Sequence, residues 1–334
     1  MNLLILILAL LSPAFSNVSR TASPGTEPIV PAAAANANAD PVASDLPQGL
    51  RRKILIIGID GLRPDALLSG HAPNLKALIR SGAFASDASA DSITRSGPGW
   101  ASVLTGVWHD KHHVYDNKID AFNGGAYPAF FKHLKEKRPD LFTACIVNWA
   151  PIRDRLMSGI DLALAPENDD SVAARAAGLL LRGDPDVMFL HFDAPDHAGH
   201  EYGFSRFSPP YRHAIARTDF LIGKVLEALQ ARPGLYREDW LILCTTDHGG
   251  TWRHHGEDIP SNRKVFLIVS GSETLRGTAI PNASLVDLAP TVMAYLGIQV
   301  DPQWGWEGKA VGLRQPAPET MQAKQSGPAA PPGG

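Results

Sequence analysis

The chain has 334 residues, of which 44% are hydrophobic and 19% are charged, and its formal net charge is −3. A chain of this length and composition can bury a large core, and it fits one large α/β domain better than two independent ones. The slightly negative charge argues against a protein that binds nucleic-acid duplexes by neutralising the phosphate backbone, so a small substrate is the expected partner.

The chain begins with a continuous apolar run over residues 3–11, followed by the small-residue segment 12–16. The run is shorter than the roughly 20 residues that a membrane-spanning helix needs, so we interpret residues 1–16 as a cleaved signal peptide. We therefore expect an exported protein, periplasmic or secreted, without a stable membrane anchor after cleavage. The Ala- and Pro-rich segment 17–50 and the Pro-, Gly- and Ala-rich tail 314–334 are expected to be disordered.

Strand-like and helix-like segments alternate between these tails. The segment 53–59 is aliphatic without alternation, which is typical of a central parallel strand buried on both faces. Further strands are predicted over 142–147, 187–192, 240–244 and 265–269, and helices over 73–80, 127–137, 171–181, 211–231 and 285–296. The alternation predicts one α/β domain over residues 51–313 with a doubly wound, mostly parallel sheet and helices on both faces.

Acidic and histidine side chains follow three of the predicted strands. Asp60 follows the first strand, Asp247 and His248 follow the strand 240–244, and the segment 193–200 follows the strand 187–192. The carboxyl ends of parallel strands meet at one edge of a sheet, so we expect these side chains to converge there. Carboxylates and imidazoles at such an edge are suitable ligands for divalent cations.

Two positions in this set have close alternatives. Asp196 and His200 are four residues apart, which on a helical turn places both side chains on one face, but Asp193 and His197 have the same spacing. Spacing alone does not choose between these two pairs. In the same way, His254 and His255 are adjacent and either could be a ligand.

Ser96 is the candidate nucleophile. It precedes a short apolar segment, 100–104, that is predicted to be helical, so its hydroxyl and the neighbouring backbone N–H groups lie at a helix N-terminus where an anion is favoured. Thr94 and Ser92 are nearby rivals. Asn117 is a neutral donor that could hold a phosphoryl oxygen.

Two cysteines, Cys145 and Cys244, both lie in apolar strand-like runs. Free cysteine in such a position packs as a small hydrophobic residue. Two lone cysteines make no disulfide framework, and the sequence leaves their pairing open.

Taken together, these segments resemble the alkaline phosphatase superfamily, and within it the type I phosphodiesterase and nucleotide pyrophosphatase branch. The resemblance extends over residues 53–296. It rests on the order of its motifs, namely Asp60-Gly61 after a strand, the Ser96 turn with Pro98, Thr105-Gly106, Asn117, Pro195-Asp196 with His200, Asp247-His248-Gly249, and His255-Gly256.

The resemblance implies two metal sites. It assigns Asp60, Asp247 and His248 to one ion together with the nucleophile Ser96, and it assigns Asp196, His200 and His255 to the other. Asp196 is preferred over Asp193 because it follows Pro195, and His255 over His254 because it precedes Gly256. The resemblance also implies that Asn117 holds a phosphoryl oxygen, and we expect the backbone N–H of Gly97 to help it. Zinc is the expected metal at both sites, with manganese as the alternative.

The implied activity is that of a two-metal phosphoric ester hydrolase that acts through a phosphoserine and is most similar to phosphodiesterases. Serine replaces the threonine that is common at the nucleophile position of the branch. A phosphomonoesterase is therefore an alternative, and the choice depends on pocket groups such as Arg95, Lys111 and Trp100.

The sequence also bears on two further alternatives. A sulfatase of the same superfamily is disfavoured because Gly99 and Trp100 follow Pro98 where its nucleophile motif has Ser and Arg, and because a single Asp60 replaces its tandem aspartates. An inactive exported binding protein would lack a metal ligand, and none is missing.

Overall fold

The structure is a computed structural model that describes residues 49–314. The predicted signal peptide, nearly all of the predicted linker and the predicted C-terminal tail lie outside the described residues. No helix within residues 49–314 is both long enough and apolar enough to cross a bilayer.

The core of the fold is a seven-stranded sheet in the order β2-β7-β6-β1-β5-β3-β4. The strands are β1 (Arg51–Ile59), β2 (Gly82–Ser89), β3 (Thr143–Val147), β4 (Leu162–Leu164), β5 (Val187–Phe192), β6 (Glu238–Thr245) and β7 (Lys264–Ser270). The five strands from β6 to β4 are mutually parallel, and β7 runs antiparallel to both of its neighbours. The predicted mostly parallel sheet is therefore confirmed, with β1 near its centre.

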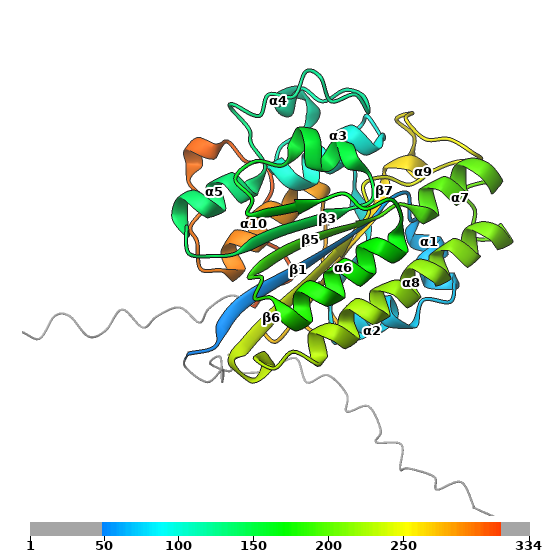
Figure 1. Cartoon of the computed structure of the whole chain (residues 1–334). Coiled ribbons are helices and arrows are strands. Elements are labelled where there is room, and N and C mark those ends of the chain that lie inside the picture. The colour runs from blue at the N-terminus through cyan, green and yellow to red at the C-terminus, as the bar shows by residue number, and fades with distance from the viewer. Residues whose placement is uncertain (1–48, 315–334) are drawn as a thin grey trace, which may run out of the picture. The chain divides into compact units, whose positions relative to one another are not determined.

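Helices cover both faces of this sheet (Figure 1). On one face lie α3 (Ser96–Thr105), α5 (Phe130–Lys137) and α10 (Leu288–Tyr295), and on the other α1 (Pro64–Ser69), α2 (Pro73–Ser81), α6 (Asp169–Arg182) and α8 (Pro209–Gln230). Shorter helices are α4 (His109–His112), α7 (Ala194–Tyr202) and α9 (Pro260–Arg263), and single turns cover Ile152–Leu156, Leu235–Arg237, Leu285–Asp287 and Pro302–Trp304.

The two cysteines are free and buried. Cys145 on β3 packs into the core on the α3 side of the sheet, whereas Cys244 on β6 packs into the core on the α8 side. Both thiols serve as small hydrophobic groups, and burial raises the pKa of each.

Two strands were not predicted from the sequence. Edge strand β2 consists mainly of Ala, Ser and Gly, which have little strand propensity, and it forms by antiparallel pairing with β7. Strand β4 has only three residues and pairs with β3. Both strands form by pairing with a neighbouring strand, because neither segment has a sequence pattern that predicts a strand.

A buried carboxylate joins two helices on the α8 side of the sheet. Helix α2 has no side-chain cap of its own, because its N-cap residue is Ala72. Asp219 of α8 is 1% exposed, and it accepts hydrogen bonds from the backbone N–H of Asn74 (3.1 Å) and of Leu75 (2.8 Å) and from the Asn74 amide (2.9 Å). The carboxylate therefore replaces the missing cap across the helix interface.

We predict that Asp219→Ala lowers the free energy of unfolding by about 3 kcal/mol, because it leaves buried N–H groups without an acceptor. Urea unfolding followed by circular dichroism measures this change. The matched control is Glu227→Ala on the same helix, since the Glu227 carboxylate is 68% exposed and pairs with Lys224; it should change stability by less than about 0.5 kcal/mol. Equal stability of the two variants would contradict the capping role.

Candidate active site

Three of the predicted site residues meet where the parallel strands end. Asp60 follows β1, and Asp247 and His248 follow β6, the strand that pairs with β1. His248 Nε2 lies 3.4 Å from Asp60 Oδ1 and 3.2 Å from Asp247 Oδ2. The parallel pairing of the two strands thus brings together side chains that are far apart in sequence.

Ser96 lies against this group. It is the first residue of α3, and its Oγ is 3.4 Å from Asp60 Oδ1 and 3.3 Å from His248 Nε2. The rival hydroxyls are engaged elsewhere, since Thr94 Oγ1 donates to the Glu257 carbonyl (2.9 Å) and Ser92 Oγ donates to Asp91 (3.3 Å). Ser96 is therefore the hydroxyl that the fold presents to the carboxylates.

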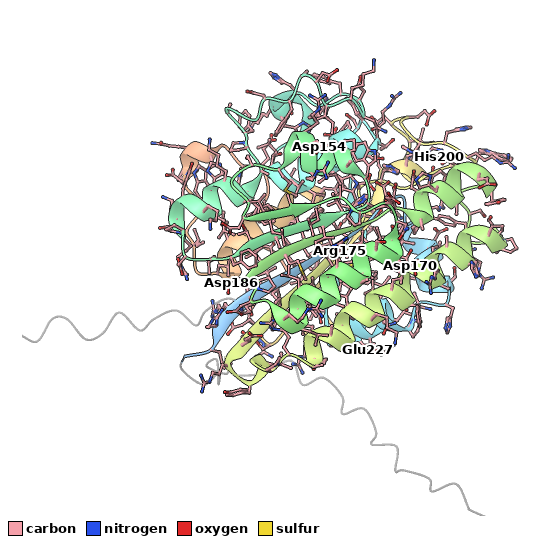
Figure 2. The ribbon with its side chains drawn as sticks, in the orientation of Figure 1. Asp154, Asp170, Arg175, Asp186, His200 and Glu227 are labelled. Carbon is pink, nitrogen blue, oxygen red and sulfur yellow. The ribbon has the colours of Figure 1, made fainter. Side chains whose placement is uncertain are left out.

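A second group lies beside the first and is built mainly from α7. Asp196 and His200 are one turn apart on this helix, with His200 Nε2 3.3 Å from Asp196 Oδ2. His255 Nε2 lies 3.6 Å from Asp196 Oδ1 and 3.0 Å from His200 Nε2. In Figure 2, His200 is seen on α7 at the end of the sheet opposite to Asp186, which directly precedes β5.

The three histidines of the two groups share one orientation. In each ring Nδ1 lies within hydrogen-bond distance of a backbone carbonyl: Gly249 for His248 (2.7 Å), Arg253 for His200 (2.9 Å) and Thr94 for His255 (2.7 Å). In a neutral ring with its proton on Nδ1, Nε2 carries the lone pair, and every Nε2 faces the carboxylates. This is the arrangement that metal-binding histidines adopt in proteins.

The rival residues are placed differently. Asp193 Oδ2 is 3.0 Å from His197 Nε2, and the His197 side chain is 77% exposed. His254 is exposed at the surface, whereas the His255 side chain is 7% exposed. The geometry thus brings Asp196 and His255, rather than Asp193 and His254, into one group with His248, whereas Asp193 lies with His191 next to Asp60.

Three carboxylates are buried close together in this site. Asp60, Asp196 and Asp247 are each less than one-tenth exposed. Burial raises the pKa of Asp247 well above its ordinary value, and the charges of Asp60 and Asp196 raise it further. Burial and the charge of Asp60 likewise raise the pKa of Asp196. Positive charge is needed to keep all three ionised at neutral pH.

The pKa shifts of the other site residues follow from the same close packing of buried charged groups. Burial opposes ionisation of Asp60, yet the hydrogen bond from His191 and the charge of His248 hold its pKa below the usual range. Burial and the charge of His248 lower the pKa of His255 to about 3, so this imidazole is neutral and free to act as a ligand. The hydrogen bond with Asp196 raises the pKa of His200 to about 9.

The donor set fits divalent cations. Asp196 Oδ1 and Asp247 Oδ2 are buried oxygens without a hydrogen-bond partner among residues 49–314. Such atoms are costly in a folded protein unless a ligand satisfies them. Gly61, with φ of +62°, makes room for one of them, because a Cβ there would lie 2.7 Å from Asp196 Oδ1. Asp60, Asp247 and His248 form one group with metal-ligand spacing, and Asp196, His248 and His255 form another.

Asn117 lies beside the nucleophile, but it does so by holding Gly97. Its Oδ1 accepts a hydrogen bond from the Gly97 N–H at 2.9 Å. That N–H is therefore already occupied, in contrast to our expectation that it would bind a phosphoryl oxygen. The side-chain Nδ2 is the donor that Asn117 retains for a substrate.

The other three expected pocket residues differ in their exposure and in their contacts. Trp100 is fully buried, and its Nε1 donates to Asp60 Oδ2 at 2.9 Å, so it supports Asp60 rather than facing a substrate. Lys111 Nζ donates to the Gly305 carbonyl (3.0 Å) and pairs with Glu307 (3.3 Å). Arg95 is exposed and lies near Gly256, so it is the one group of this set that is open to solvent at the site.

His191 was not identified from the sequence. It is fully buried in β5, and its Nε2 lies 3.1 Å from Asp60 Oδ2. The only signal was a histidine inside an otherwise apolar strand. Such a residue needs a buried partner.

We predict that His255→Ala weakens zinc binding by at least about 10- to 100-fold, whereas His254→Ala leaves it nearly unchanged. The physical reason is that the His255 Nε2 faces Asp196 inside the site and the His254 side chain faces solvent. Elemental analysis of purified, zinc-equilibrated protein measures the loss. Asp196→Ala and Asp193→Ala form a second matched pair, in which Asp196→Ala should lose more zinc. If His254→Ala lost more zinc than His255→Ala, or Asp193→Ala more than Asp196→Ala, then His254 or Asp193 would be the ligand instead.

Comparison with known proteins agrees with this geometry. The model of the family described as type I phosphodiesterase / nucleotide pyrophosphatase matches residues 54–158 and 148–267. The human bis(5'-adenosyl)-triphosphatase ENPP4 is 24% identical over 231 residues, which cover 62% of this chain and 49% of that protein. The chain spans about half the length of the curated relatives it matches.

Solved structures share the fold at lower identity. Murine ectonucleotide pyrophosphatase / phosphodiesterase 5, in complex with AMP, superposes with a TM-score of 0.62 at 15% identity, over 75% of this chain and 96% of that chain. A 2-O GAG sulfatase superposes with the same TM-score of 0.62 at 13% identity, over 78% of this chain and 73% of that chain. These likenesses show the alkaline phosphatase-like fold that the sheet order and the helix layers already indicate. Because the family model matches residues 54–158 and 148–267, which together make up more than half of the chain, the chain belongs to the type I phosphodiesterase / nucleotide pyrophosphatase family of the alkaline phosphatase superfamily.

Proposed function

We propose that this protein is a two-metal phosphoric ester hydrolase that acts on small phosphodiesters through a phosphoserine at Ser96. The observation that carries the proposal is the position of Ser96 Oγ, within 3.4 Å of both Asp60 Oδ1 and His248 Nε2. This hydroxyl lies at the N-terminus of the ten-residue helix α3. Two buried carboxylate oxygens of the same candidate site, Asp196 Oδ1 and Asp247 Oδ2, lack partners among the described residues. A serine in this setting is suited to attack an anionic ester.

Asp60, Asp247, His248 and Ser96 would hold one ion, and Asp196, His200 and His255 the other. When bound, two divalent cations neutralise the carboxylates, favour ionisation of the serine hydroxyl and polarise the phosphoryl group. Mixed carboxylate and imidazole ligands favour zinc, and manganese accepts the same set. The orphaned oxygens of Asp196 and Asp247 support the assignment of one ion to each group.

The reaction has two displacements at phosphorus. In the first, Ser96 Oγ forms a bond to phosphorus while the bond from phosphorus to the leaving oxygen breaks. The leaving group takes up the proton of the serine hydroxyl and departs as an alcohol. In the second, water attacks the phosphorus of the phosphoseryl intermediate, which still carries the other ester group. The bond between Ser96 Oγ and phosphorus breaks, a phosphate monoester is released, and a proton from the water restores the Ser96 hydroxyl. The Asn117 Nδ2 and the N-terminal dipole of α3 favour the negative charge that develops on the phosphoryl oxygens.

Export of the protein, periplasmic or secreted, is part of the same proposal. It is supported by the apolar run over residues 3–11, which lies outside the described residues. The expected partner is a small phosphate ester, and binding to nucleic-acid duplexes is not expected at a net charge of −3.

We predict that Ser96→Ala lowers kcat/KM for an aryl phosphodiester by about a thousandfold or more, because the variant lacks the attacking oxygen. Ser92→Ala is the matched control, since Ser92 Oγ bonds Asp91 and not the candidate site, and it should retain nearly full activity. Near-ultraviolet circular dichroism checks that both variants are folded. If Ser96→Ala kept more than about a tenth of the activity, another nucleophile would carry the reaction.

A comparison of esters tests the substrate class. With zinc-loaded protein, we expect kcat/KM for bis(p-nitrophenyl) phosphate to exceed that for p-nitrophenyl phosphate by about tenfold or more, and p-nitrophenyl sulfate to be the poorest substrate. Rates measured in parallel with Ser96→Ala correct for contaminating enzymes. A faster monoester would favour the phosphomonoesterase alternative, and a faster sulfate would favour a sulfatase. No turnover of any ester by a zinc-loaded, folded protein would favour a binding protein.

A further inference from the structure

The two carboxylate oxygens of Asp60 have different surroundings. Oδ1 faces the candidate site, 3.4 Å from both Ser96 Oγ and His248 Nε2. Oδ2 faces away from them and lies within hydrogen-bond distance of Trp100 Nε1 (2.9 Å) and His191 Nε2 (3.1 Å). All three residues are at most 1% exposed. The carboxylate is thus held from one side, and its other oxygen is left for a ligand.

The His191 ring is itself fixed. Its Nδ1 lies 3.5 Å from the backbone N–H of Trp149, which is consistent with an Nε2–H that donates to Asp60. The ring also packs edge-on against Trp100, with centroids 5.0 Å apart. Both donors to Oδ2 are therefore locked in place by the core around them.

A third cation site is the alternative explanation, because Asp60, His191 and Asp193 also have metal-ligand spacing. The hydrogen bonds argue against it. The His191 Nε2 is directed at Asp60 Oδ2, and Asp193 Oδ2 lies 3.0 Å from His197 Nε2. Among residues 49–314, the buried carboxylate oxygens without partners belong instead to Asp196 and Asp247 in the candidate site and to Asp239 near the start of β6.

Trp100 also connects Asp60 to the nucleophile. It lies on α3 four residues after Ser96, about one helical turn. Its ring packs against β1 where Gly58 leaves space, since a Cβ at Gly58 would lie 2.5 Å from the Trp100 ring. The hydrogen bond from Nε1 therefore sets the position of the first turn of α3 relative to Asp60.

We propose that His191 and Trp100 are positioning residues, which bind Asp60 Oδ2 so that Oδ1 alone is presented to a cation and to Ser96. The inference rests on the proposed two-metal function and adds two residues to it. It predicts that the hydrogen bonds to Oδ2 set the affinity of the ion held by Asp60, Asp247 and His248.

Zinc affinity of the purified full-length protein tests this role without reference to activity. The variants are made in a His200→Ala background, which is expected to retain only the ion held by Asp60, and dissociation constants are measured by competition with a chromophoric chelator. His191→Leu, which removes the donor, should weaken zinc binding by about 10- to 100-fold, whereas His191→Gln, which keeps an N–H donor at a similar position, should recover most of the affinity. Trp100→Phe removes only one N–H and keeps the ring, so it tests the same bond with little risk to folding.

The matched control is His112→Leu. His112 is also fully buried and hydrogen-bonds Ser102, but it does not touch the carboxylates of the site. Loss of this imidazole should lower thermal stability without changing the zinc affinity. Unchanged affinity in both His191→Leu and Trp100→Phe, or an equal loss in His112→Leu, would overturn the positioning role alone. A wild-type protein that binds no zinc would overturn the two-metal function and this inference with it.

Discussion

The burial of three carboxylates against one another is the constraint on which the rest of the site depends. Asp60, Asp196 and Asp247 lie at the end of the sheet with little access to water, and like charges at this separation strongly oppose ionisation. Several neighbouring groups offset the repulsion between these carboxylates. Imidazole Nε2 atoms point inward, the N-terminus of α3 approaches from above the sheet, and two oxygens are left without partners among the described residues. We expect bound cations to stabilise such an arrangement.

The fold supplies the positions, and the side chains supply the chemistry. Parallel pairing of β1 with β5 and β6 brings three strand ends together, and α7 then places Asp196 and His200 on one face. A solved sulfatase superposes on this chain as well as a nucleotide pyrophosphatase does, so the fold does not separate the two reactions. The case against a sulfatase rests instead on local residues of the sequence, namely Gly99 and Trp100 after Pro98 and the single Asp60.

The sequence predicted five of the seven strands and the convergence of Asp60, Asp247 and His248, because these depend on local patterns. The aliphatic run of β1 and the acidic and histidine residues that follow the strands predicted where these side chains meet. Strand β2 was missed because its small residues carry no strand signal and it forms by pairing with β7. His191 and the buried position of Trp100 were missed because their partner, Asp60, is distant in sequence. The engagement of the Gly97 N–H by Asn117 is also a contact across a loop, which spacing along the chain does not reveal.

The central proposal is that this carboxylate cluster holds two cations. Anomalous diffraction at the zinc absorption edge, from crystals grown with zinc, tests it most directly. The account predicts two peaks in the anomalous map, one bounded by Asp60, Asp247, His248 and Ser96 and the other by Asp196, His200 and His255. A single peak, or a peak bound by Asp193 and His191 on the far side of Asp60, would contradict it.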